Sequence, residues 1–284
     1  MARQRGAALL IALLAVALAA LLAVGLIERS QRDVARTTGV VNAERAWQFA
    51  EGVEGLARDW IRRQREAGGQ ASLLDGRWSE PFAVPGGSVR GRMLARDGRF
   101  NLNALASRDP ALAEQARRTL SGLLELLSVD PALGEDILSL FEGGVEGQPV
   151  RLAHLSELDR LERYTPAERE RLQPYLAVLP DPRARINVNR APPEVLAAAI
   201  DGLAPEAARS LIARVPFETL EEVLAQPEFV QLDAGVIRRR LSVRSEWFLV
   251  HAQVALDGTV RDYFRLVGTS GSRYDFRYLS QGVP

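Results

Sequence analysis

Hydrophobic and polar positions change their spacing along the first quarter of the chain. Residues 7–27 form an uninterrupted apolar run, and as a helix this run would be about 31 Å long, close to the hydrocarbon thickness of a bilayer. In the polar stretch that follows, Phe49, Val53, Leu56 and Trp60 recur every three or four residues, as on one face of a helix. No proline interrupts residues 28–66. The pattern predicts one long helix with a membrane-spanning part over 7–27 and a packed face over 28–66.

A second, narrower pattern lies on the same predicted helix. Ile27, Val34 and Val41 are each seven residues apart, which is the spacing of a seam against a neighbouring helix. Three positions at this spacing also arise by chance, so both interpretations stay open.

Alternating patterns at both ends of the remaining chain predict strands. Residues 89–96 alternate and are followed by Asp97-Gly98, and the runs 246–256 and 259–268 flank Asp257-Gly258. Each Asp-Gly pair predicts a hairpin turn, and a third run follows at 273–279. Because the residues between these strands favour helices, we expect an α+β fold: an N-terminal transmembrane and stalk helix packed on an antiparallel sheet, with a large all-α domain inserted between its strands.

The predicted insertion contains an internal echo. GRFNLNALASRDP at 98–110 and ARINVNRAPPEVL at 184–196 share two asparagines in alternation with apolar residues, which predicts two helical subdomains. We expect the asparagines to cap the turns that follow them; they are Asn101, Asn103, Asn187 and Asn189. The predicted ranges are 78–101 for the first strands, 102–183 and 184–240 for the two subdomains, and 243–284 for the returning strands.

The second subdomain has the pattern of a helix-hairpin-helix. Pro193 and Pro205 suit helix starts and Gly202 suits a helix end. Such hairpins often bind DNA phosphates, so a membrane-anchored DNA-binding or DNA-uptake protein is the alternative function. Asp201 and Glu206 place negative charge where a phosphate would lie, and the whole chain has no net charge, so we expect no nucleic-acid partner.

The composition leaves little for catalysis. There is no cysteine, which excludes disulfides, thiolate nucleophiles and zinc-thiolate sites. The histidines are His154 and His251, and no serine stands in a nucleophile-elbow sequence. Glu218, Glu221 and Glu222 cluster at a predicted helix start, where carboxylates are favoured in any protein. We therefore expect no enzyme and no catalytic residues.

The leader MARQRG ends at Gly6, directly before the apolar run. A cleaved secretion signal has a shorter apolar segment followed by a small-residue cleavage site. The sequence instead resembles the class III leader of pilins and pseudopilins, and the resemblance implies cleavage between Gly6 and Ala7 on the cytoplasmic side. Most pilins carry glutamate at the fifth mature residue, whereas this chain has Ile11, an absence typical of K-type minor pseudopilins.

Three further segments carry this resemblance through most of the chain. GRFNLNAL, ERLQPYLAVLP and INVNRAPPEVLAAAI occur in the order found in the K-type minor pseudopilins of type II secretion systems. The resemblance implies a pilin-like sheet and an insertion of two SAM-like parts. It also implies a subunit at the pseudopilus tip that initiates and caps the filament and regulates its length during export of folded proteins across the outer membrane.

The same resemblance implies partners and a location. The partners are the I-type and J-type minor pseudopilins, the major pseudopilin, the prepilin peptidase and the inner-membrane assembly platform. The protein would cross the Gram-negative inner membrane once, with a cytoplasmic N-terminus and a periplasmic head.

Relatives in this family commonly have a long Asp-rich loop associated with calcium. Here the corresponding loop, residues 142–148, offers only Glu142 and Glu146, a small supply for an ion that takes six to eight oxygen ligands. We therefore predict no metal site from the residues themselves; calcium is implied by the resemblance alone, with Glu142 and Glu146 as its candidate ligands. Asp130, Glu135 and Asp136 could join them or could simply cap helices.

Overall fold

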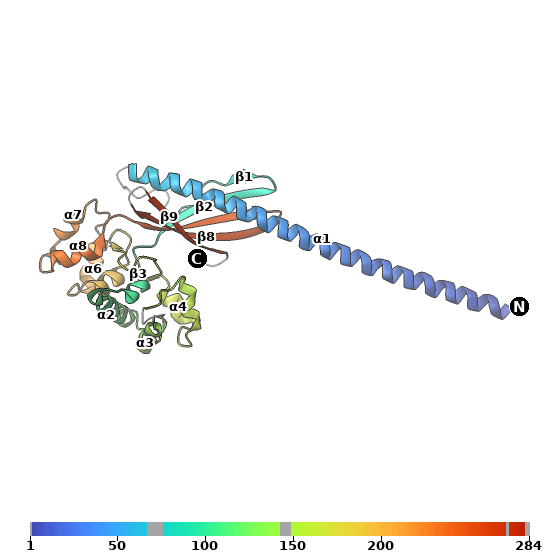
Figure 1. The fold of residues 1–284 in the computed structure, drawn as a ribbon, viewed down its shortest axis with the longest axis horizontal. Helices are drawn as coiled ribbons and strands as arrows, with labels where there is room; N and C mark the ends of the chain where they lie inside the picture. Colours follow the sequence, from blue (N-terminus) through green and yellow to red (C-terminus); the bar gives the residue numbers. More distant parts are fainter. Residues whose placement is uncertain (1, 67–75, 143–148, 271–272, 282–284) are drawn as a thin grey trace.

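The computed structural model describes residues 2–66, 76–142, 149–270 and 273–281 (Figure 1). Within these ranges, the side chains of residues 2–12, 15, 17, 19, 54, 64–66, 270, 273, 274, 276–279 and 281 fall outside the description.

Helix α1, Ala2–Glu66, extends far beyond the rest of the molecule and lies on the sheet only with its C-terminal part (Figure 1). The buried face there consists mainly of small residues: Ala46, Ala50, Val53, Ala57 and Ile61. Small side chains let the helix approach the sheet closely, and a Cβ at Gly91 of the sheet would lie 3.0 Å from Val53 Cγ1. Of the predicted face, the structure places Val53 in this core, Phe49 and Trp60 at its margin, and Leu56 partly exposed.

The sheet has five antiparallel strands in the order β1-β2-β7-β8-β9. Their bounds are β1 Phe82–Val84, β2 Gly87–Ala95, β7 Trp247–Leu256, β8 Thr259–Ser270 and β9 Arg273–Gln281. Strand β2 pairs with β7, from Gly87 opposite Leu256 to Ala95 opposite Phe248, although the whole insertion separates them in sequence. The expected fold of a long helix, an antiparallel sheet and an inserted helical region is confirmed at this level.

One of the two predicted hairpin turns is present. Asp257 and Gly258 both have positive φ, at 47° and 77°, and join β7 to β8 as predicted. The hairpin at Asp97-Gly98 was wrong: the chain leaves the sheet there, because residues 100–101 pair with the helical region and β2 takes β7 as its partner. The hairpin that does involve β2 turns at Gly86, whose φ is 88°, and joins β1.

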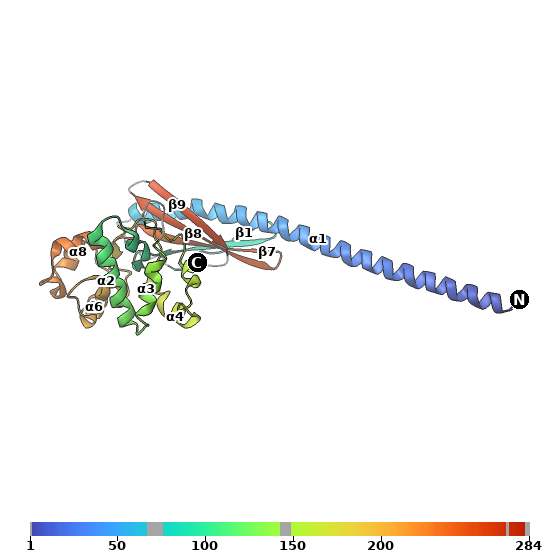
Figure 2. The same ribbon diagram turned by 60° about the horizontal axis from the view of Figure 1, so that its bottom comes forward.

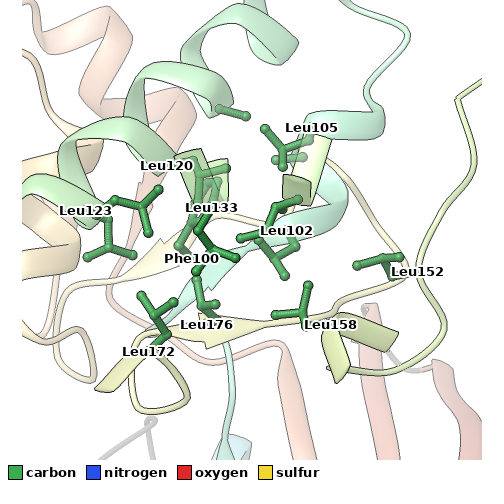
Figure 3. Packing of buried hydrophobic residues seen from close by; sticks show 14 of the residues in the cluster. Phe100, Leu102, Leu105, Leu120, Leu123, Leu133, Leu152, Leu158, Leu172 and Leu176 are labelled. Atoms are coloured by element: carbon green, nitrogen blue, oxygen red, sulfur yellow. The ribbon is translucent and has the colours of Figure 1, made fainter. Parts of the chain in front are cut away.

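The first inserted subdomain is helical around a leucine-rich core (Figure 3). Its elements are β3 Phe100–Asn101, η1 Leu102–Ala106, α2 Pro110–Leu126, α3 Ala132–Ser139, η3 Leu155–Arg160, α4 Pro166–Leu172 and β4 Leu176–Ala177. Thr165 caps α4 as its sequence suggests, with its hydroxyl accepting from the Glu168 N–H and donating to the Glu168 carboxylate. The parallel pair β3-β4 brings the beginning and end of this subdomain together.

The second subdomain is built on the same plan. Its elements are β5 Ile186–Asn187, α5 Pro193–Ala199, α6 Pro205–Ile212, α7 Leu220–Leu224, η4 Pro227–Phe229, α8 Ala234–Arg240 and β6 Leu241–Ser242. The helix starts predicted at Pro193 and Pro205 are confirmed. Here too a parallel pair, β5-β6, joins the beginning of the subdomain to its end.

Both helical subdomains lie at the end of the molecule opposite the N-terminus, beside the sheet (Figures 1 and 2). Leu249, Phe264 and Leu266 of the sheet face the first subdomain across a shallow crevice, where His154 and Leu155 line the other wall. The head is therefore wide at the far end of α1 and narrow where α1 leaves it.

Candidate functional site

The N-terminal half of α1 presents apolar side chains without a covering layer. The described ones are more than half exposed from Leu13 to Ile27: Leu13, Leu14, Val16, Leu18, Leu21, Leu22, Val24, Leu26 and Ile27. An apolar surface of this extent marks a site of association with lipid or protein. Ile27, Val34 and Val41, the predicted seam, are 58%, 62% and 44% exposed, so they are available to a neighbouring helix.

Among the helices of the described residues, none reaches the combination of length and hydropathy needed to cross a membrane. Gly6, Ala7 and Ile11 lie in the part of α1 whose side chains fall outside the description. The cleavage site and the membrane-spanning part over 7–27 remain predictions.

The exposed part of α1 ends where polar and aromatic contacts attach it to the head. Asn42 Nδ2 donates to Asp257 Oδ2 at 2.9 Å, in the turn between β7 and β8. Trp47 packs edge-on against Tyr263, with ring centroids 6.1 Å apart. These contacts divide α1 into a free stretch up to Val41 and a docked stretch from Asn42 onward.

The neck of the insertion is held by one aspartate. Asp97 Oδ2 accepts hydrogen bonds from the backbone N–H groups of Glu246 (2.6 Å) and Trp247 (3.3 Å), so the leaving and returning chains are tied together. The Asp97 carbonyl also accepts from Asn187 N–H at 2.8 Å, which attaches the second subdomain. Burial raises the pKa of Asp97 to about 6.

The two asparagine pairs close the subdomains in the same way. Asn101 and Asn187 each accept from the N–H two residues ahead, at 3.1 and 3.0 Å, which confirms their predicted role in capping the turn. For Asn103 and Asn189 the capping prediction was wrong, because their side chains bond to two distant chain segments each. Distant bonds also supplement the caps of the first members, from Asn101 to Asp181 O and from Asn187 to Ser245 Oγ.

In the first subdomain, Asn103 joins Leu152 and Leu179. Its amide donates to both backbone carbonyls at 3.0 Å and its Oδ1 accepts from Leu152 N–H at 2.8 Å. In the second subdomain, Asn189 joins Phe217 and Val243 with the same three bonds, at 2.8, 2.8 and 2.9 Å. We call these two arrangements the asparagine clamps.

The predicted helix-hairpin-helix turn is present between α5 and α6, and α2 of the neighbouring subdomain contacts its beginning. Gln115 of α2 donates to Ala199 O and to Asp201 Oδ1, both at 3.3 Å. Arg118 lies 3.8 Å from Asp201, and Arg240 donates to Ala199 O at 2.6 Å. Asp201, Gly202 and Ala204 of the turn are exposed, and the Asp201 carboxylate puts negative charge where a DNA-binding hairpin would hold a phosphate, which argues against the alternative function.

The residues considered for chemistry have structural partners. His154 caps η3 by accepting from Ser156 N–H at 3.2 Å. His251 is 6% exposed and lies between Arg92 and Asp262. Glu222 caps the start of α7 by accepting from Glu218 N–H at 2.9 Å, and Glu221 lies 3.8 Å from Arg238.

The structure describes one of the two calcium candidates. Glu142 is exposed and Glu146 lies outside the described residues. Asp130 caps Ala132 N–H at 2.9 Å and Asp136 pairs with Arg163 at 2.7 Å, while Glu135 is exposed in the first turn of α3. Within the described ranges, no three His, Asp or Glu side chains gather as metal ligands would.

The fold and its exposed helix define a subunit that acts through association of α1, with a head carried at the far end. Comparison with known proteins agrees. Residues 98–181 and 186–244, together half of the chain, match the family described as "Type II secretion system (T2SS), protein K". The chain therefore belongs to the protein K family of type II secretion systems and is a minor pseudopilin.

Relatives and a solved structure extend the match over nearly the whole chain. The type II secretion system protein K of Pseudomonas aeruginosa is 27% identical and that of Klebsiella pneumoniae 28%; each alignment covers 89% of this chain, and 85% and 89% of the respective relative. A chain in the crystal structure of the GspK-GspI-GspJ complex from enterotoxigenic Escherichia coli has the same fold. The TM-score is 0.70 at 20% identity, over 88% of this chain and all of that one.

Proposed function

We propose that this minor pseudopilin stands at the tip of the pseudopilus, where it helps to initiate the filament, caps it and limits its length. The observation that carries the proposal is the position of the two helical subdomains, beside the sheet at the end opposite the N-terminus (Figure 1). A subunit added above this one would have to place its own helix where the widened head lies. A subunit added below meets only the free stretch of α1.

The proposed assembly begins with removal of the leader after Gly6. The mature helix, starting at Ala7, would leave the inner membrane and pack beside partner helices through the free stretch of α1. Ile11 supports a tip position, because in this family a glutamate at that place would neutralise the amino terminus of the next subunit. An uncompensated charge in an apolar interior is costly, so a subunit with isoleucine fits where no subunit follows.

The proposed partners are the I-type and J-type minor pseudopilins, and the likeness to a chain of the GspK-GspI-GspJ complex supports them. The major pseudopilin, the prepilin peptidase and the assembly platform complete the set. We place the protein in the inner membrane as a single span with a periplasmic head, without catalysis, nucleic acid or a resident metal. The two subdomains would be SAM-like modules.

Filament length tests the proposal. Raising the amount of this chain relative to the major pseudopilin should shorten the pseudopili seen by electron microscopy of detergent-extracted filaments, because each tip subunit ends one filament. The control is Gly6→Val, which the peptidase should not cleave and which should therefore not shorten filaments. Unchanged length with a cleaved, membrane-extracted protein would contradict capping.

A further inference from the structure

The sheet face opposite α1 carries two arginines stacked on one tryptophan. Arg90 and Arg92 alternate along β2 with the residues that pack on α1, so both point to the opposite face. Their guanidinium carbons lie 4.4 and 4.6 Å from the centroid of the Trp78 ring. Trp78 is kept at this edge because the neighbouring Ser79 N–H donates to Gly91 O at 2.8 Å.

Each arginine is held in place by a residue of β7. Arg90 donates through Nε and Nη2 to Gln253 Oε1, at 2.9 and 2.6 Å. Arg92 donates through Nε to His251 Nδ1 at 3.0 Å. Because Nδ1 of His251 accepts, the ring proton is on Nε2, which faces Asp262 Oδ1 at 2.7 Å.

His251 is buried beneath aromatic rings. Trp78 and Phe264 lie on it with centroid distances of 4.7 and 4.2 Å. Burial lowers the pKa of His251, so the ring is neutral at neutral pH and remains an acceptor for Arg92. His251 is thus a positioning residue for the Arg92 guanidinium.

Asp262 is the carboxylate that shares this part of the face with the two arginines, and its charge acts on Arg92 at longer range. Among the described residues, no carboxylate lies within ion-pairing distance of Arg90 or Arg92, and the Asp262 carboxylate is already engaged by His251 and by Gln253 Nε2 at 3.0 Å. The titratable and charged groups here are therefore Arg90, Arg92, His251 and Asp262. With a neutral His251, these four groups together carry a net positive charge.

Such a group is suited to binding a partner. Stacking on Trp78 occupies the faces of the guanidinium planes and leaves N–H groups at their edges for a carboxylate. Both side chains are already ordered, so little conformational entropy is lost on binding. Tryptophan and arginine are also the residue types that dominate the energy of protein interfaces.

The position of the patch agrees with this role. On one side of the arginines, the next row of side chains across the paired strands is Leu94, Leu249 and Leu266, and the last two line the crevice beside the first subdomain. On the other side of the arginines, the neighbouring row across the strands ends at Val260 of β8, which is more than half exposed. Arg90, Arg92 and Trp78 are each half-buried on this face, and an exposed apolar residue lies at its border.

We infer that Arg90, Arg92 and Trp78 form a docking site for an acidic segment of a neighbouring protein subunit. The partner is assigned to the filament on the strength of the proposed function; the preference for carboxylates comes from the site itself. We call this group the arginine site.

A short acidic peptide tests the chemistry without any partner protein. The full chain in non-ionic detergent would be titrated with acetylated tetraglutamate amide by calorimetry at low salt, and with the tetraglutamine peptide for comparison. We expect saturable binding of tetraglutamate only, weakened at least tenfold by R90Q/R92Q. The matched control R117Q/R183Q removes the same charge at two exposed positions away from the site, Arg117 in the first subdomain and Arg183 in the linker after it. It should leave binding unchanged.

Several outcomes would overturn the inference. They are no binding to the native chain, equal weakening by both double variants, or binding of phosphatidylglycerol vesicles through the arginine site in place of the peptide. If R90Q/R92Q unfolds, R90Q alone answers the same question, because it leaves the hydrogen bond between Arg92 and His251 intact; it should weaken binding about threefold.

Association with partners separates the arginine site from the proposed function. If the native chain copurifies with its I-type and J-type pseudopilins and R90Q/R92Q does so tenfold less, the inference is supported. If both associate equally, the inference falls and the proposed function stands. If neither associates but the peptide still binds through the arginine site, the site stands and the proposed partners are wrong.

Discussion

The two inserted subdomains use the same clamp in different surroundings. In the first, Asn103 is 1% exposed, and its partners Leu152 and Leu179 are 5% and 1% exposed. In the second, Asn189 is only half-buried, and of its partners Phe217 is buried and Val243 is half-buried. The comparison teaches that the alternating asparagine motif specifies local geometry, while the depth of the surrounding core decides how much each clamp stabilises.

Removing the first clamp should have the largest effect. Asn103→Ala deletes three hydrogen bonds and leaves three buried backbone groups without partners, a loss of about 4 kcal/mol in the free energy of unfolding. Urea denaturation of the full chain in detergent would measure it. Hydrogen exchange should rise over 98–181 far more than over 186–244, and uniform exchange would show that the subdomains do not open separately.

The pH should change the stability of the junction between the insertion and the sheet, where Asp97 bonds to Glu246 and Trp247. The pKa of Asp97 is raised from 3.8 to about 6 because burial disfavours its charge. A raised folded-state pKa means that the contribution of Asp97 is greatest below pH 3.8 and falls as the pH rises through 6, by up to about 3 kcal/mol. The free energy of unfolding would be measured for the native chain and for Asp97→Asn by chemical denaturation at several pH values from 4 to 7. The native value minus the variant value should decline as the pH rises; a constant difference would contradict the assignment.

Breaking the second clamp should cost less than breaking the first. Asn189→Ala removes the same number of bonds, but water can reach some of the abandoned groups, so we expect a loss of about 2 kcal/mol. The measurement is the same urea titration. If Asn189→Ala cost as much as Asn103→Ala, exposure would not explain the difference between the clamps.

The smallest of these effects belongs to the hairpin turn of the second subdomain. Gly202 has a φ of 86°, and a Cβ there would lie 3.1 Å from Leu232 Cδ2. Gly202→Ala should lower stability by about 1 kcal/mol through backbone strain. Gly258→Ala, which shares a positive φ but meets no atom within 4 Å, is the control that isolates the contact with Leu232 in thermal unfolding.

Local signals accounted for the parts of the fold that depend on a few neighbouring residues. The proline helix starts, the Asp257-Gly258 turn and the capping by Asn101 and Asn187 could be predicted because each feature is completed within two to four residues. Asp97-Gly98 misled for the same reason. The turn residues were present, but the strand that would have completed the hairpin was not the next one in the chain.

The candidate sites divide along the same line. The apolar pattern of α1 and the family motifs are visible in the order of residues, since both are properties of one continuous segment. The partners of Asn103 and Asn189, the contact of Gln115 with the hairpin turn, and the chain from Arg92 through His251 to Asp262 join residues far apart. Arg92 meets His251 only because β2 pairs with β7 across the insertion. The other contacts form only when segments that are distant in sequence pack together within the insertion or across neighbouring strands, so only the tertiary structure could decide them.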